Sequence, residues 1–332
     1  MTRRQFHSAI ISSLLVAAGI AGCAKPPHDP EENFVLVSAN LAVPYWKTAQ
    51  SGFFAAAAKL KVKAETVGPS DYNPQAQVEE FRKAVRRKPA GILVSVADPV
   101  LMKPEIDAAI AAGIPVISID SDAPESKRLF SIGTNNYQAG LAGGARAAKL
   151  LNGKGNVIVF TMPGQRNLDE RLKGYKDAFA DHPGIKITDI IDIKGDPRIT
   201  FDKTNEIMGT RKDSINGFIC LEALSGREVA TVLERYKIKG KVVVAMDTDD
   251  RTLEWIDKGW IDATISQKPY SMAYIGLMML DFLHHNKLDN LDHNWREDSA
   301  APIPLFVDTG QMLVDKENLG AFREANKAAP GK

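Results

Sequence analysis

The chain has 332 residues, of which 44% are hydrophobic and 25% charged, and its 42 basic and 41 acidic residues give a formal net charge of +1. This balance argues against a nucleic-acid partner, because nucleic-acid-binding proteins concentrate basic residues on one surface. The length exceeds what one hydrophobic core usually holds, so two domains are expected.

The first 22 residues are typical of an export signal. Arg3 and Arg4 precede an apolar run, residues 9–21, that is shorter than the roughly 20 apolar residues of a membrane-spanning helix. "TRRQF" resembles a twin-arginine export motif, and "IAGC" resembles a lipobox, in which a peptidase cuts before the cysteine and its sulfur receives a lipid. Residues 1–22 are therefore predicted to be a signal peptide, and Cys23 the lipid attachment point. The alternative is a cytosolic N-terminus with a chance arginine pair and a buried cysteine.

Residues 23–33 are a predicted tether, because three prolines and four charged residues without periodicity favour an extended, solvated segment. Removal of the signal would leave 40 basic and 41 acidic residues, with Cys220 as the last thiol. Cys220 lies in the apolar stretch "GFICLEA", so we expect a packed core residue and no intramolecular disulfide. The chain has no CxxC or HExxH motif and its six histidines show no ligand spacing, so no metal and no cofactor are predicted.

From residue 34 onward, short apolar runs alternate with amphipathic stretches. Strands are expected at 34–38, 62–67, 91–96, 114–120, 156–160, 185–192, 217–221, 241–247 and 261–266, and helices between them at 45–60, 73–88, 136–151 and 227–237. Continuous apolar strands separated by helices indicate parallel sheets covered on both faces, the doubly wound α/β class. Ligands of such proteins bind beyond the carboxyl ends of the strands.

Polar residues follow many of these runs. They are Ser38, Asn40, Ser95, Asp98, Asp120, Ser121, Asp122, Glu222, Asp247 to Asp250, and Gln267. Any one of them could belong to a solvated loop, since turns favour such residues. Their coincidence at successive strand ends indicates a shared site.

Several motifs together resemble one family. They are "VPYW" (43–46), "AAGIPVISIDSD" (111–122), "SIGTNNYQAG" (131–140), "NLDERLKGY" (167–175), "VVAMDTDD" (243–250) and "IDKGWIDATISQKP" (256–269). Residues 33 to about 314 resemble the periplasmic sugar-binding proteins of the ribose, galactose and xylose type, the substrate-binding components of ABC importers.

The resemblance implies a particular domain organisation. Two doubly wound parallel-sheet lobes are joined by a three-crossing hinge and close on the ligand. The crossings are expected near 133–135, 267–269 and 300–304. Lobe one would be residues 34–134 plus 268–300, and lobe two residues 135–267 plus 301–332.

The resemblance also implies site residues. Tyr45 and Trp46 correspond to aromatic residues that flank the sugar, although both could simply pack in the core. Asp120 and Asp247 correspond to the acids that end a strand in each lobe, and Gln267 to the hinge amide. Further ligand-binding candidates are Asn40, Asp122, Asn167, Asp169 and Glu222.

The chain departs from the family pattern in the number of charges at the site. Asp169 stands where an arginine is common, Arg171 is expected to face structure, and Glu222 replaces a usual asparagine. A pocket rich in carboxylates disfavours sugar acids and sugar phosphates, which would face like charges.

The expected function is therefore capture of a neutral monosaccharide or polyol by a monomeric, lipid-anchored envelope protein that delivers it to an ABC-transporter permease. An amino sugar, an autoinducer-type furanosyl signal, or a sensory receptor role are the alternatives that the sequence leaves open. A glycosidase is disfavoured because the resemblance implies that the pocket carboxylates accept hydrogen bonds from sugar hydroxyls and do not act as catalytic acids or bases. A repressor is disfavoured because a signal and tether stand where a helix-turn-helix would be.

Overall fold

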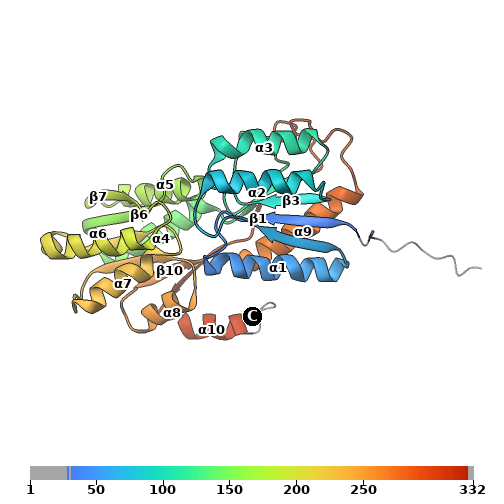
Figure 1. Cartoon of the computed structure of the whole chain (residues 1–332). Helices are drawn as coiled ribbons and strands as arrows, with labels where there is room; N and C mark the ends of the chain where they lie inside the picture. Colours follow the sequence, from blue (N-terminus) through green and yellow to red (C-terminus); the bar gives the residue numbers. More distant parts are fainter. Residues whose placement is uncertain (1–27, 30, 328–332) are drawn as a thin grey trace, which may run out of the picture.

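The computed structural model describes residues 28, 29 and 31–327. The predicted signal peptide and Cys23 lie outside the described residues. Figure 1 shows two lobes side by side, each built on one six-stranded sheet with strand orders β11-β5-β4-β3-β1-β2 and β12-β10-β9-β8-β6-β7. Among the described residues, no helix is both long enough and apolar enough to cross a bilayer.

Lobe one contains the first sheet and four helices. Its strands are β1 (Asn33–Val37), β2 (Lys63–Val67), β3 (Gly91–Val94), β4 (Val116–Ile119), β5 (Ser131–Gly133) and β11 (Phe306–Asp308), all paired in parallel. Its helices are α1 (Pro44–Leu60), α2 (Pro74–Arg86), α3 (Pro99–Ala111) and α9 (Pro269–His285).

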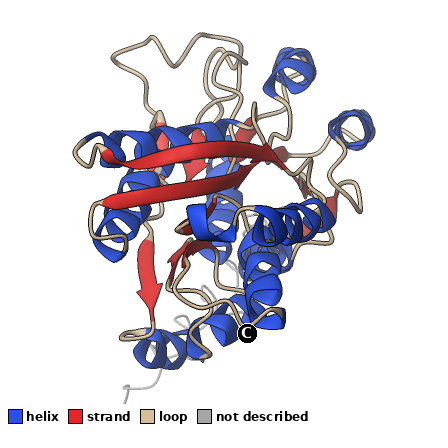
Figure 2. Ribbon diagram, turned by 90° about the vertical axis from the view of Figure 1, so that its left-hand side faces the viewer, coloured by secondary structure: helices blue, strands red, loops and turns tan. Residues whose placement is uncertain are grey.

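Lobe two contains the second sheet. Its strands are β6 (Lys154–Thr161), β7 (Gly184–Asp192), β8 (Gly217–Cys220), β9 (Val242–Met246), β10 (Ala263–Ser266) and β12 (Met312–Asp315), of which only the β10–β12 pair is antiparallel among those described. Its helices are α4 (Asn136–Leu150), α5 (Arg166–Ala180), α6 (Pro197–Thr210), the 3₁₀ turn η1 (Lys212–Ser214), α7 (Ser225–Arg235), α8 (Asp250–Asp257) and α10 (Leu319–Lys327). Helices lie on both sides of the strands (Figure 2), so the predicted doubly wound α/β class is confirmed.

Local sequence chemistry explains where several helices begin. Asn73, Asp98 and Asp196 each precede a proline and accept a hydrogen bond from a backbone N–H of the following turn. A side-chain acceptor at the N-cap satisfies an otherwise unpaired donor, and proline at the first helical position lacks the N–H that would be unpaired there. Asp98 thus caps α3. Its position after a strand had made it a candidate for the shared ligand site, but its side chain is used by the helix.

Helix α9 returns to lobe one after the second crossing. Its buried face, including Met272, Leu277 and Leu280, belongs to the core formed by β1, β3 and β4. The helix also packs so closely on α1 that a Cβ placed on Gly52 would lie 2.1 Å from the carbonyl oxygen of Tyr270. A residue without a side chain is therefore required at this crossing.

The third crossing lies later than expected. Because β11 pairs with β5 of lobe one and β12 with β10 of lobe two, the chain crosses between Asp308 and Met312. The prediction of a crossing at 300–304, with residues 301–332 in lobe two, is therefore wrong for residues up to 308. Strand β11 has only three residues and is partly exposed, and so short a strand carries little periodicity.

The end of the predicted tether also differs from the expectation. The Lys63 ammonium contacts the Glu31 carboxylate at 2.5 Å, and Asn33 already begins β1. The His28 side chain is only 15% exposed. Residues 28, 29 and 31–33 therefore lie against lobe one, whereas residues 23–27 lie outside the described part of the chain.

Candidate functional site

Asp120 and Asp247 occupy equivalent places in the two lobes. Asp120 follows β4 and Asp247 follows β9, the third strand in each sheet order. Their φ angles are 66° and 68°, and each backbone N–H donates to the next strand, Asp120 to Ile132 at 2.9 Å and Asp247 to Ile265 at 2.8 Å. A left-handed backbone is uncommon for residues other than glycine and is concentrated at functional sites. Both carboxylates are thereby turned from the strand ends into the space between the lobes.

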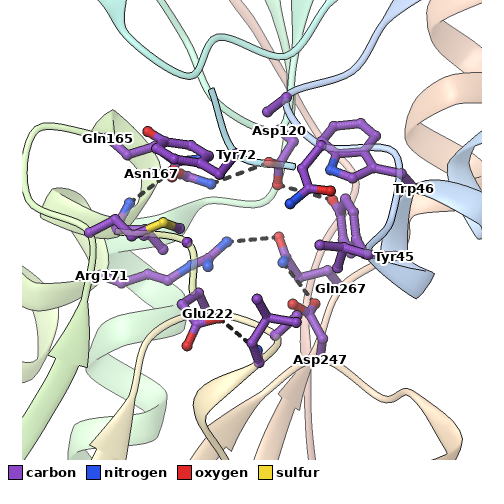
Figure 3. Close-up of a pocket in the computed structure, with 18 residues that line it drawn as sticks. Tyr45, Trp46, Tyr72, Asp120, Gln165, Asn167, Arg171, Glu222, Asp247 and Gln267 are labelled. Carbon is purple, nitrogen blue, oxygen red and sulfur yellow. Dashed lines mark hydrogen bonds between the residues drawn. The ribbon is translucent and has the colours of Figure 1, made fainter. Parts of the chain in front are cut away.

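A pocket of about 570 Å³ of empty space, partly open to solvent, lies between the two lobes. Figure 3 shows that the side chains which surround it come from both lobes and point toward one another. It is lined by Ala39, Asn40, Val43, Tyr45, Trp46, Tyr72 and Asp120 of lobe one, by Met162, Gln165, Asn167, Leu168, Arg171, Gly195, Glu222, Ala223, Leu224 and Asp247 of lobe two, and by Gln267 at a crossing.

Asp120 connects the two lobes. The Tyr45 hydroxyl donates to its Oδ1 at 3.0 Å from within lobe one, and the Asn167 amide donates to its Oδ2 at 3.3 Å from α5 of lobe two. One carboxylate thus has partners on both sides of the pocket.

Asp247 is held by a chain of hydrogen bonds. The Gln267 amide donates to Asp247 Oδ1 at 2.9 Å, and the Gln267 carbonyl oxygen accepts from Arg171 at 3.0 Å (Figure 3). Arg171 also donates to Asn136 Oδ1 at 2.9 Å and to the Leu221 carbonyl at 2.8 Å. Arg171 is therefore fixed in place by three protein acceptors and orients the hinge amide.

Glu222 lines the pocket but also caps a helix. Its two oxygens accept from the backbone N–H groups of Leu224 at 2.6 Å and Ser225 at 2.9 Å, at the start of α7. The Ser225 hydroxyl donates to the same carboxylate. A carboxylate at a helix N-terminus is favoured by the helix dipole, so this residue has a local structural role as well as a place in the pocket.

Three aromatic side chains border the pocket. Tyr45 and Trp46 lie at the start of α1 with their rings edge to face, 5.2 Å between centroids, and Trp46 is 5% exposed. The Tyr72 hydroxyl donates to the Ala97 carbonyl at 3.0 Å, which holds its ring in the β2–α2 loop at the pocket wall. Trp46 belongs both to the pocket lining and to the core of lobe one, so the two alternatives stated for it are not exclusive.

Burial changes the acidity of the pocket carboxyls. Removal from water raises the pKa of Asp247 to about 7, opposed by Arg171 and by the Gln267 hydrogen bond and reinforced by the charges of Asp120 and Glu222. Burial likewise raises the pKa of Asp120, opposed by Arg171, and the pKa of Glu222, opposed by the Ser225 hydrogen bond. The fold therefore holds three carboxyl groups in one buried pocket, where their charged forms are less stable than in water.

Two predicted site residues lie outside this pocket. Asp122 forms a paired contact with Arg128, at 2.6 Å from each of its two oxygens, and accepts from the Ser118 hydroxyl. Asp169 accepts from the Gly164 backbone N–H at 3.1 Å and closes the loop before α5. Neither lines the space between Asp120 and Asp247.

The other predicted residues are brought together. Asn40, Tyr45, Trp46, Asp120, Asn167, Glu222, Asp247 and Gln267 all line the pocket. The Asn40 side-chain Oδ1 accepts from the Ala42 backbone N–H at 2.8 Å, which holds the Asn40 amide at the pocket wall. Cys220 is buried in the core of lobe two as expected.

Sequence reasoning missed three polar side chains of the pocket. Arg171 was expected to face structure, and its buried guanidinium does donate to three protein acceptors, but the residue also lines the pocket. Tyr72 lies in a loop without a motif. Gln165 lies before α5, and its Oε1 is buried with no hydrogen-bond partner among the described residues. Only the i, i+4 spacing of Asn167 and Arg171, which places both on one face of a helix, could have indicated any of these three.

Comparison with known proteins now places the chain in a family. A family model described as "Periplasmic binding protein domain" matches residues 34–287. The chain belongs to this family.

Relatives of this periplasmic binding protein are found among curated and solved proteins. The xylose/arabinose-binding protein XylF of Sulfolobus acidocaldarius is 22% identical over 320 residues, 91% of this chain and 75% of that protein. A solved sugar ABC transporter (sugar-binding protein) from Bacillus halodurans is 34% identical with a TM-score of 0.77, over 88% of this chain and 100% of that one.

Two further solved structures are similar to this periplasmic binding protein. AraP, an arabinose-binding protein from Geobacillus stearothermophilus, is 32% identical with a TM-score of 0.72, over 88% and 99% of the two chains. A structure titled XylFII-LytSN complex is 26% identical with a TM-score of 0.77, over 86% and 98%. These likenesses extend along both lobes.

Proposed function

We propose that this periplasmic binding protein captures a small neutral sugar or polyol between its lobes and delivers it to the permease of an ABC importer. The observation that carries the proposal is the pair Asp120 and Asp247, which end equivalent strands of the two lobes and face one pocket. A ligand that bridges them contacts both lobes at once.

The chemistry of the lining fits hydroxyl groups. A sugar hydroxyl both donates and accepts, so a matching site offers carboxylate and amide oxygens together with N–H donors. Asp120 and Asp247 supply acceptors, Asn40 and Asn167 supply amides, and the unpaired Gln165 Oε1 supplies a further acceptor. The rings of Tyr45 and Trp46 offer apolar faces to the C–H groups of the sugar.

The charges of the lining disfavour an anionic ligand. Three carboxyl groups, Asp120, Glu222 and Asp247, line the pocket together with one guanidinium, Arg171. The Arg171 nitrogens already donate to Asn136, Leu221 and Gln267, so this cation is committed to the protein. A sugar acid or phosphate would meet uncompensated negative charge in a poorly solvated space.

Closure of the lobes is the proposed mechanism. The contact of Asn167 with Asp120 and the approach of Gly195 to Tyr72 both join lobe one to lobe two. A ligand shifts an open–closed equilibrium only by its preference for the closed form, and groups from both lobes provide that preference. The closed form would be the one that the permease recognises.

We further propose that the mature protein is a monomer, exported and held at the cell envelope through a lipid on Cys23. Membership of a periplasmic binding protein family supports export. Mass spectrometry of the N-terminus of protein made in its native host is the test, with a diacylated Cys23 as the expected result. An unmodified N-terminus that retains Met1 would contradict both export and anchoring.

The experiment that tests sugar capture is a thermal-shift screen followed by titration calorimetry. The panel contains neutral pentoses, hexoses and polyols, amino sugars, a furanosyl autoinducer-type compound, sugar acids and sugar phosphates. We expect at least one neutral sugar to raise the unfolding temperature and bind one to one, with no response to the anions. Binding confined to anions, or no sugar response, would overturn the proposal. Release of sugar from a panel of glycosides would instead indicate an enzyme.

A sensory role is the second candidate. The structure titled XylFII-LytSN complex contains a similar chain together with a second protein, which favours considering a receptor partner here. A pull-down with sugar-loaded protein separates the two roles, because an importer component recovers permease subunits and a sensor component recovers a signalling receptor.

A further inference from the structure

Four metal-ligating side chains meet at the far end of lobe one, away from the sugar pocket. His28 and Glu32 precede β1, and Asp281 and His285 lie in the last turns of α9. Each pair has an i, i+4 spacing, which on helix α9 places Asp281 and His285 on the same face. The two segments are more than 240 residues apart in the sequence, so no local sequence motif could predict the cluster.

Five of the six distances among the four ligand atoms are short and nearly equal, and all four atoms lie within 4.8 Å of one another. His28 Nδ1 lies 3.3 Å from Glu32 Oε2, 3.3 Å from Asp281 Oδ1 and 3.2 Å from His285 Nε2. His285 Nε2 lies 3.2 Å from Glu32 Oε2 and 3.5 Å from Asp281 Oδ1. One ligand atom from each residue therefore faces the same point.

These separations are those of a tetrahedral metal site. Zinc binds histidine nitrogen and carboxylate oxygen at about 2.0–2.2 Å, which in a tetrahedron places the ligand atoms about 3.3–3.6 Å apart. Five of the six edges of the cluster, at 3.2 to 3.5 Å, lie in or next to that interval. Two nitrogens and two oxygens are also a donor set that suits zinc and its neighbours in the transition series.

Hydrogen bonding alone does not satisfy the cluster. Each ring nitrogen that faces the centre carries at most one proton, yet each lies within 3.5 Å of three other ligand atoms. Asp281 is 9% exposed, and its buried Oδ1 makes no well-aligned hydrogen bond among the described residues, although the two imidazole nitrogens lie 3.3 and 3.5 Å away. A buried carboxylate oxygen without a well-aligned donor is costly, and a bound cation would relieve that cost.

Glu32 has the second contact that orients a metal ligand. Its Oε1 accepts from the Asp29 backbone N–H at 2.9 Å, which leaves Oε2 directed at the two imidazoles. Hydrogen bonds of this kind fix the rotamer of a ligating carboxylate.

We propose that His28, Glu32, Asp281 and His285 bind one divalent transition-metal ion of the zinc class. Calcium and magnesium do not fit, because they prefer sites made only of oxygen. The ion would join the segment that follows Cys23 to the end of α9 and so fix where the N-terminal segment leaves lobe one.

The site lies on lobe one alone. Helix α9 has 17 residues and begins at the crossing, so its last turn is about 25 Å from the hinge at about 1.5 Å per residue. Figure 1 shows the start of β1 at the end of lobe one opposite to lobe two. Metal binding is therefore independent of the proposed sugar capture, and zinc should leave sugar affinity unchanged.

The test is zinc titration of the chain purified without a polyhistidine tag, by competition with a chromophoric chelator and by thermal unfolding. We expect one equivalent of Zn²⁺ to bind and to raise the unfolding temperature, and Co²⁺ to give the visible absorption of a four-coordinate ion. His285→Ala and Glu32→Gln are each expected to weaken Zn²⁺ binding about tenfold or more. Loss of a residue that only orients a metal ligand already weakens metal binding about tenfold, and loss of a ligand should cost at least as much.

The matched control is His293→Ala, because His293 contacts a carboxylate, Asp298, at 2.9 Å outside the cluster. This variant is expected to bind zinc like the unmodified chain. Circular dichroism of each variant checks that it is folded. If His285→Ala fails to fold, Glu32→Gln still tests the site, because it replaces only one side-chain atom of the ligand. No zinc binding by the unmodified chain, or equal binding by the folded cluster variants, would overturn the proposal, and neither result bears on sugar capture.

Discussion

Asp120 and Asp247 show how a single backbone conformation sets the direction of a functional side chain. Each follows a fully buried strand, and each has a positive φ that turns the chain sharply at the sheet edge. Aspartate tolerates this conformation better than most residues. The two carboxylates consequently face each other across the lobes, whereas Asp122, two residues after Asp120, points to Arg128.

Removal of either carboxylate should weaken sugar binding. Asp120→Ala and Asp247→Ala are each expected to raise the dissociation constant about tenfold or more, equivalent to about 1.4 kcal/mol, because each removes an acceptor from the ligand. Asp169→Ala is the control, since Asp169 lies outside the pocket and should leave affinity unchanged. Titration calorimetry measures all three, and an unchanged affinity in Asp120→Ala or Asp247→Ala would remove that residue from the site.

The raised pKa of Asp247 predicts a pH dependence of stability. Asp247 keeps its proton in the folded protein up to about pH 7, but only to near pH 4 when unfolded. Between these values the folded state binds more protons, so the free energy of unfolding falls as the pH rises. We expect a lower unfolding temperature of the sugar-free protein at pH 8 than at pH 5.5, and a smaller difference in Asp247→Asn. An equal difference in the variant would show that Asp247 does not titrate in this window.

At the scale of elements, close helix packing and helix capping decide the geometry of the lobes. Helices α1 and α9 approach so closely at Gly52 that the Tyr270 backbone occupies the place of a side chain. Helix α1 carries Tyr45 and Trp46 at its start, and α9 begins two residues after Gln267. The contact between these two helices therefore positions the aromatic wall of the pocket relative to the hinge amide.

Gly52→Ala should destabilise lobe one. The added methyl group would overlap the Tyr270 carbonyl, and overpacking of this kind costs about 1–3 kcal/mol. Gly209→Ala in α6 is the matched control, because a Cβ there meets nothing within 4 Å. That control should be neutral or stabilising by up to about 1 kcal/mol, since alanine favours helix. Denaturant unfolding compares the two, and equal stability of both variants would contradict the close contact.

At the scale of the whole molecule, the two lobes repeat one design around the pocket. The strand orders correspond position by position, from the edge strands β11 and β12 through to β2 and β7. The lobes meet where Gly195, with a φ of 73°, approaches the Tyr72 side chain. A Cβ at Gly195 would lie 2.4 Å from the Tyr72 Cβ, so this contact exists only because residue 195 has no side chain.

Gly195→Asn should hold the lobes apart. Asparagine accepts the left-handed backbone, so the fold is expected to persist, but its side chain would overlap Tyr72. We expect sugar affinity to fall about tenfold or more and the radius of gyration with sugar to exceed that of the unmodified protein, measured by calorimetry and small-angle scattering. Gly240→Asn, at a similar φ of 80° with open space around it, should change neither. Normal closure in Gly195→Asn would refute the contact as a determinant.

Much of this arrangement could be predicted from sequence, and the failures have definite causes. The apolar runs predicted the strands of both sheets apart from β5 (Ser131–Gly133), β11 and β12, which are only three or four residues long. The resemblance aligned Asp169 with a sugar-binding arginine and left Arg171 to face structure, whereas the structure places Arg171 in the pocket lining and Asp169 outside it. Two residues along a helix point about 200° apart, so an alignment that is two residues out exchanges them.

The sequence by itself determined the doubly wound class, because strand periodicity is a local property of the chain. The family resemblance of its motifs implied the equivalence of Asp120 and Asp247 and eight of the eighteen residues that line the pocket. Only the tertiary structure decided which polar residues at strand ends cap helices, which pair with Arg128, and which face the pocket. It also brought His28 and Glu32 beside Asp281 and His285. Contacts between distant segments depend on how helices and strands pack in three dimensions, and no spacing along the chain encodes them.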